Sequence, residues 1–200
     1  MDNRPLYFAA VDAFLVLADQ VRPDDWERPA LGVWDVRSLV GHTGRAMTTV
    51  RDYLAKPAEQ VACQTAAEYF AAALSRASAD VHEGVAQRGV AEGQALGEDP
   101  PASLRALADQ VRALLADAGN PVVTTFAGGM RLQDYLQTRV FELTVHSLDL
   151  ADALGHTYEL PREAVELSVE MIGRVGVLSG RGPQVLRVLT GRGGSPFSLL

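Results

Sequence analysis

Two residues that could bind a metal ion, Glu142 and His146, stand four positions apart in a stretch where apolar residues repeat at helical spacing. This spacing places their side chains one turn apart on the same face of a helix. His146 also falls on the apolar stripe that contains Leu143 and Leu150. Because burying a polar group without a partner is unfavourable, we expect the pair either to share a hydrogen bond that fixes the helix register or to bind a metal.

A third candidate ligand, His42, lies beside Leu39 and Ala46 on the flank of the apolar stripe of an earlier helix. If the two helices face each other, His42 meets the Glu142/His146 pair. Two imidazoles and one carboxylate suit Zn²⁺ with an open fourth position, and they also suit Ni²⁺, Fe²⁺ and Mn²⁺. The spacing by itself is not a metal signature, so a buried His–Glu hydrogen bond remains the alternative.

Charged residues stand one helical turn from each candidate ligand. Arg45 follows His42 by three positions, and Arg139 precedes Glu142 by three. These arginines are the candidate catalytic residues, because either could orient a carboxylate substrate or pair with Glu142. The alternative for both is a structural salt bridge. Asp149 follows His146 by three positions and either holds a ring N–H of that histidine or faces solvent.

Helical periodicity runs through most of the chain, and alternating strand patterns are scarce, which predicts an all-α fold. The glycines and prolines at positions 89, 93, 97, 100 and 101 are assigned to a loop. One strand-like run, 122–126, precedes two glycines and is expected to form a hairpin or an extended connector. The predicted helices cover about residues 6–21, 35–56, 65–87, 101–118, 131–154 and 161–178.

Length and composition restrict the classes of function. The 200 residues suit one domain, in which 156–200 form a C-terminal helical extension packed on the bundle. The net charge of -7, with Lys56 as the only lysine, argues against nucleic-acid and membrane partners. The single Cys63 and an N-terminal apolar stretch interrupted by Asp12 favour a cytoplasmic protein. The preference for Arg over Lys fits a GC-rich, actinobacterial coding bias.

Three segments together resemble the mycothiol-dependent maleylpyruvate isomerase family. Segment 34–42, WDVRSLVGH, resembles the family's W-x-V-R-D-L-V-x-H, with Ser38 where an acidic residue is common. Segment 142–150, ELTVHSLDL, resembles E-x-x-x-H-x-x-D-L, which is followed in the family by an Ala-rich stretch and a Gly, as here. Segment 188–192, VLTGR, resembles a Leu-x-Gly-Arg element near the end of many members.

The resemblance implies a DinB-like four-helix bundle with additional C-terminal helices. It also implies a metal held by His42 of the second helix and by Glu142 and His146 of the fourth. In the family the metal activates mycothiol, so the expected activity is S-transfer to, or cis–trans isomerisation of, a small electrophile. A hydrolase and a non-catalytic metal-binding bundle are the alternatives. Larger members carry a further C-terminal domain that this length does not accommodate, which argues against maleylpyruvate itself. A homodimer fits the habit of related bundles.

Overall fold

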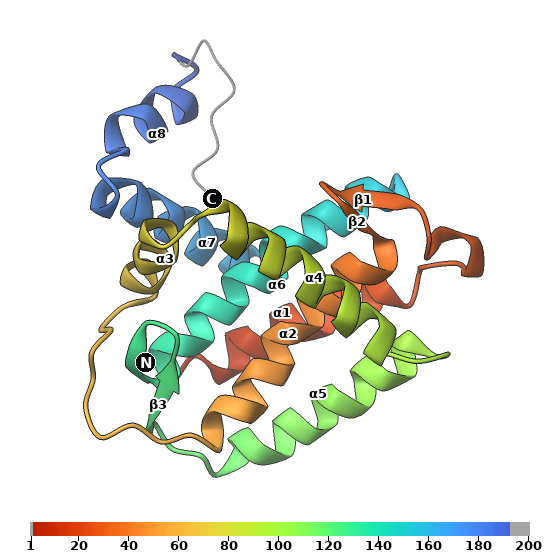
Figure 1. Cartoon of the computed structure of the whole chain (residues 1–200), viewed down its shortest axis with the longest axis horizontal. Coiled ribbons are helices and arrows are strands. Elements are labelled where there is room, and N and C mark those ends of the chain that lie inside the picture. Colours follow the sequence, from red (N-terminus) through yellow and green to blue (C-terminus); the bar gives the residue numbers. More distant parts are fainter. Residues whose placement is uncertain (1, 193–200) are drawn as a thin grey trace.

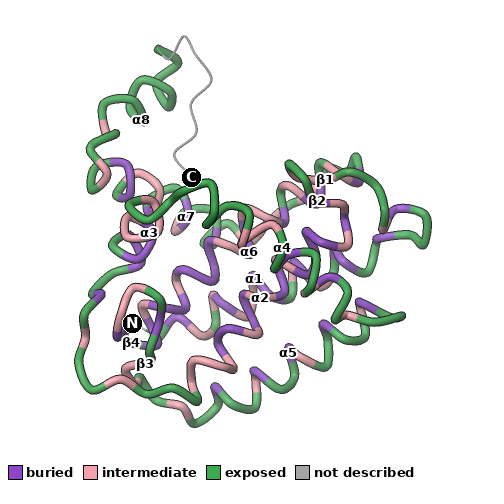
Figure 2. Tube along the Cα trace, viewed as in Figure 1, coloured by how far each residue is buried: buried purple, intermediate pink, exposed green. Residues whose placement is uncertain are grey.

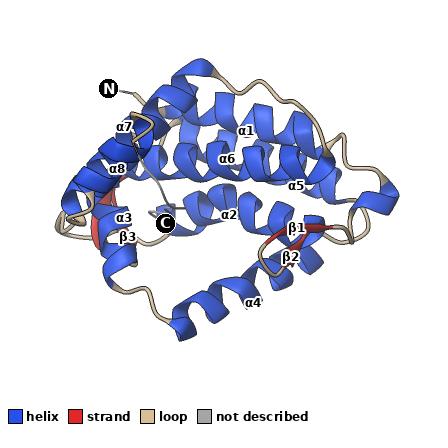
Figure 3. Ribbon diagram, turned by 90° about the horizontal axis from the view of Figure 1, so that it is seen from above, coloured by secondary structure: helices blue, strands red, loops and turns tan. Residues whose placement is uncertain are grey.

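Four long helices form a bundle in which α1 and α2 each contact both α5 and α6 (Figures 1 and 3). A computed structural model describes residues 2–192 of the chain. The predicted all-α fold, a four-helix bundle with additional C-terminal helices, is confirmed. The bundle helices are α1 (Arg4–Ala18), α2 (Val36–Leu54), α5 (Pro100–Ala116) and α6 (Leu132–Leu154).

Local sequence signals set where the bundle helices begin and end. Asp35 caps α2, and its carboxylate accepts a hydrogen bond of 2.7 Å from the backbone N–H of Ser38. Asp99 caps α5 through the N–H of Ala102 at 3.0 Å. Gly155 ends α6 in the left-handed conformation, with φ of 71°, which residues with a Cβ avoid. An N-cap such as Asp35 or Asp99 stabilises a helix by about 1 kcal/mol. The observed start of α2 and end of α6 agree with their predicted boundaries.

The core fills the space between these helices, where Figure 2 shows their inward faces as buried. Its apolar stripe on α6 is interrupted by buried Arg139, at the level of the candidate site. The largest fully buried side chains are Tyr7, Phe14, Leu17, Leu39, Met47, Leu104, Leu115, Met130, Leu132, Tyr135, Leu136 and Leu143.

The predicted helix 65–87 is wrong, because the chain forms two helices there, α3 (Ala66–Ser75) and α4 (Ala79–Ala95). Ser78 adopts an extended conformation, and its hydroxyl accepts a hydrogen bond of 3.3 Å from the N–H of Val81 to begin α4. The break allows α3 to pack on α6 while α4 crosses to α2. Both helices lie outside the four-helix bundle, so α6 is its fourth helix.

The predicted loop at Gly89 and Gly93 is also wrong, because α4 continues through both glycines. The two glycines lie where α4 meets α2 and strand β2 (Trp34–Asp35), which leads into α2. A Cβ on Gly41 would lie 2.2 Å from the backbone nitrogen of Gly93, and one on Gly89 would lie 2.6 Å from the ring of Trp34. The two helices therefore touch backbone to backbone, and the glycines serve this close approach instead of ending the helix.

The remaining elements flank the bundle. The loop before α2 contains the 3₁₀ turn Pro23–Asp25 and a short hairpin of β1 (Pro29–Leu31) and β2 (Trp34–Asp35). The predicted strand-like run forms a hairpin of β3 (Val122–Thr125) and β4 (Gly128–Arg131).

Two further helices follow α6. The first, α7 (Arg162–Leu178), packs against α6 and α3, and the second, α8 (Gly182–Leu189), packs on α7 and extends away from the bundle (Figure 1). Within residues 2–192, no helix is long and apolar enough to cross a bilayer.

Candidate metal centre

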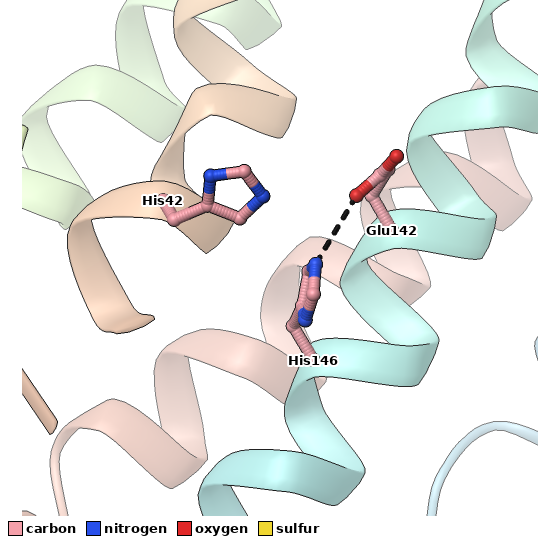
Figure 4. A group of neighbouring side chains, drawn as sticks. All are labelled: His42, Glu142 and His146. Carbon is pink, nitrogen blue, oxygen red and sulfur yellow. Dashed lines mark ion pairs between the residues drawn. The ribbon is translucent and has the colours of Figure 1, made fainter. Parts of the chain in front are cut away.

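His42 of α2 meets Glu142 and His146 of α6 in the space between the two helices (Figure 4). One potential ligand atom from each residue lies within 4.8 Å of the other two. The side chains are partly buried, with Glu142 24% and His146 15% exposed. The structure therefore brings all three predicted ligands together. Across residues 2–192 they are the one group of three or more His, Cys, Asp or Glu side chains arranged to hold a metal ion.

Carboxylates hold both ring nitrogens of His146. Its Nε2 lies 3.3 Å from Oε2 of Glu142, and its Nδ1 lies 2.9 Å from Oδ2 of Asp149. Because an ionised carboxylate can only accept, Nδ1 donates its N–H to Asp149. This hydrogen bond fixes the ring and directs Nε2 toward Glu142, as is typical of histidines that bind metals.

Stacking, instead of a hydrogen bond, orients the ring of His42. The Trp34 ring lies 4.4 Å from it, centroid to centroid, at an angle of 34°. Trp34 is itself fixed, since its indole N–H donates to the carbonyl of Ala86 at 2.9 Å. Nδ1 of His42 is buried and has no hydrogen-bond partner in the described part of the chain. The Trp34 contact was not among the expectations from the sequence, although the place of Trp34 in segment 34–42 was a signal for it.

The pKa values of His42, Glu142 and His146 are shifted from their ordinary values, and those of the two histidines are shifted in opposite directions. Burial lowers the pKa of His42 to about 4, and the charge of His146 adds to this effect. Burial also opposes the charge on His146, but hydrogen bonds to Asp149 and Glu142 outweigh it and raise the pKa of His146 to about 9. Burial of Glu142 is similarly outweighed by His146 and Arg139, which lower its pKa to about 2. Without a metal, neutral pH therefore leaves His42 neutral and His146 protonated beside a carboxylate.

The donor set fits a divalent metal. Two imidazoles and a carboxylate are ligands of open zinc sites, where they bind at about 2.0–2.2 Å. At these distances two ligands of a tetrahedral ion are about 3.4 Å apart. His146 Nε2 and Glu142 Oε2 are 3.3 Å apart, which matches this separation, while His42 closes the group from the other helix, with all three ligand atoms within 4.8 Å of one another. The triad can thus bind a metal, and zinc is one of several divalent ions that it suits.

Arg139 is fixed beside Glu142, as its position one turn earlier suggested. Its side chain is 8% exposed, and its Nη2 lies 3.8 Å from Oε1 of Glu142. The same nitrogen donates to the hydroxyl of Tyr69 at 3.3 Å, while Nε donates to Thr138 at 2.9 Å. The guanidinium also lies 4.9 Å from the centre of the Tyr135 ring. These contacts hold a positive charge in one place next to the triad.

Arg45 has a different partner from the one considered in the sequence. It pairs with Glu92 of α4 at 2.8 Å instead of with Glu142. Glu92 was not a candidate from the sequence, because no pattern there places α4 against α2. The side chains of Arg45 and Glu92 are 27% and 30% exposed, so the pair is expected to stabilise the fold by no more than about 1 kcal/mol.

Arg45 and Arg139 share a cavity of about 520 Å³ with Arg76 and Arg88. We call it the arginine cavity. It is bordered by residues of α2, α3, α4 and α6, and both His42 and Glu142 line it. Its volume is typical of sites for small molecules, and its four guanidinium groups favour an anionic ligand.

Residues 7–151 match the family described as mycothiol maleylpyruvate isomerase N-terminal domain. The match covers well over half of the chain, which therefore belongs to this family, and the resemblance seen in the sequence is confirmed. The matched region contains the triad and Asp149, whereas α7 and α8 lie beyond it. No curated protein and no solved structure matches the chain.

Proposed function

We propose that this protein is a divalent-metal-dependent enzyme that activates a low-molecular-weight thiol for S-transfer to, or cis–trans isomerisation of, a small electrophile. The family description favours mycothiol as the thiol. The observation that carries the proposal is that His42, Glu142 and His146 form a donor group of which two members line the arginine cavity. A metal bound there supplies a Lewis acid that lowers the pKa of a thiol at its open position.

The chain's own residues prepare the site. Asp149 holds one nitrogen of His146, so the other remains directed at Glu142. Arg139, charged and held in place, is suited to orient a carboxylate of the substrate from within the cavity. Arg45 is the second candidate for that role, with part of its charge balanced by Glu92. A non-catalytic metal protein would close the coordination with its own side chains, whereas this triad adjoins a cavity.

Elemental analysis of protein purified without a metal-affinity tag tests the proposal. We expect about one divalent metal per chain in the wild type, much less in His146→Ala, and an unchanged content in His82→Ala, which alters an exposed histidine of α4. Metal-loaded protein is then assayed for transfer of mycothiol to model electrophiles. A wild type that takes up no metal after reconstitution refutes the proposal.

A further inference from the structure

A second concave surface reaches the triad from the His146 side. It encloses about 860 Å³ and is bordered mainly by α6, α7 and α8. Glu142, His146 and Asp149 line it from α6, and most of the remaining lining is aliphatic or aromatic, including Leu148 of α6 and Val169 of α7. We call this surface the apolar groove.

The triad separates two compartments of different chemistry. His42 lines the arginine cavity, His146 lines the apolar groove, and Glu142 borders both. The arginine cavity is lined by four arginines, whereas no arginine or lysine among the described residues lines the groove. The ionisable side chains of the groove are two carboxylates and one imidazole, and all three belong to Glu142, His146 and Asp149 of α6. Charge complementarity therefore directs anionic groups to the cavity and disfavours them in the groove.

We propose that the apolar groove is the subsite for the uncharged aryl or alkyl body of the electrophile, whose reactive end then lies beside His146. The groove's volume suits a small molecule, and a mainly apolar lining with a few polar groups is typical of such sites. The role in the reaction rests on the proposed function, but binding in the groove can be tested by itself. Because α7 and α8 lie beyond residues 7–151, part of the groove's apolar lining comes from helices outside the matched family region.

Fluorescence titration with N-phenyl-1-naphthylamine, an uncharged apolar dye, tests the groove in metal-free protein. We expect saturable binding of the dye, which Leu148→Glu and Val169→Glu should each weaken at least about tenfold. The reason is that the bound dye would remove water from the carboxylate of the introduced glutamate. These side chains are 47% and 53% exposed, so the variants are expected to fold, which circular dichroism checks. Val177→Glu is the matched control, since Val177 lies on the same α7, is 70% exposed and does not line the groove.

Binding that is absent, or equally affected by all three variants, overturns the proposal. A second copy of the chain could instead cover the groove. Sedimentation would then show a dimer that Leu148→Glu dissociates, together with no dye binding, and that result also overturns the proposal.

The position of the dye relative to the triad is read from its proton NMR relaxation. Protein loaded with paramagnetic Co²⁺ is expected to relax the bound dye faster than protein loaded with Zn²⁺, and His146→Ala should remove the difference. Dye that binds without this effect lies away from the triad and contradicts the subsite. If the protein takes up neither Co²⁺ nor any other divalent metal, the proposed function fails, while the titration of metal-free protein still decides whether the groove binds the dye.

Discussion

His146 and Asp149 contact each other at 2.9 Å, through the ring nitrogen of His146 that does not face Glu142. The contact follows from helix geometry, because residues three apart on α6 lie on neighbouring turns of one face. The helix α6 thus presents two candidate ligands, Glu142 and His146, together with the Asp149 carboxylate that orients the ring of His146. The arrangement places the preorganisation of the site in α6 itself, before α2 contributes His42.

Replacing Asp149 by Ala should weaken metal binding by about 10- to 100-fold, because His146 loses the acceptor that fixes its ring. Asp149→Asn keeps an acceptor oxygen, so its metal affinity should fall less than that of Asp149→Ala. Asp152→Ala, an exposed position on the same helix, is the control and should bind as the wild type does. Competition with a chromophoric chelator measures the three affinities. Equal affinities for Asp149→Ala and Asp152→Ala would show that the contact does not support the site.

Metal affinity should rise with pH between about 5 and 8. In the absence of metal, His146 is protonated up to its pKa of about 9, so a metal must displace that proton. His42, with its pKa of about 4, is already neutral in this range and releases none. Binding should therefore release about one proton and strengthen about tenfold per pH unit. Calorimetry in buffers of different ionisation enthalpy measures the release, and a flat affinity contradicts the two-histidine ligand set.

The sequence predicted that the three side chains of the triad meet, and two signals made this possible. Polar residues on the outer face of α2 define its apolar stripe and place His42 on the flank of that stripe. In α6 the spacing of four between Glu142 and His146 was the signal, because polar residues such as Thr138 and Ser147 are buried on that helix as well. In α1, Tyr7 and Phe14 are buried, whereas their neighbours Phe8 and Leu15 are only partly buried. Nearly every position of α1 is apolar, so periodicity alone could not choose its inner face.

The path of α4 could not be predicted because its glycines have two opposite readings. Glycine ends helices, but it also permits two helices to touch. Only the position of Gly41 on α2 shows that the second reading applies, and that contact joins residues 52 positions apart in the chain. Glu92, and with it the pairing of Arg45, depends on the same contact.

Gly41→Ala should destabilise the fold, by about 1–3 kcal/mol, and disturb the adjacent His42. The added Cβ would lie 2.2 Å from the backbone nitrogen of Gly93, and a helix backbone can make room only by shifting as a whole. Gly173→Ala is the matched control, because that helical glycine of α7 has no atom within 4 Å of the new Cβ. It should stabilise by about 0.5–1 kcal/mol. Chemical denaturation measures both changes, and similar stabilities would contradict the close α2–α4 contact.

Removing the metal should lower the melting temperature, because the ion joins α2 to α6 and binds only the folded triad. At a free metal concentration a hundredfold above Kd, binding stabilises the folded state by about 2.7 kcal/mol. A chelator should abolish this gain in the wild type and change nothing in His42→Ala, which lacks the ligand from α2. His156→Ala, at an exposed position after α6, should retain the full gain. If chelated and loaded wild type melt at the same temperature, the three side chains merely bond to one another, and the buried His–Glu contact considered at the outset is the better description.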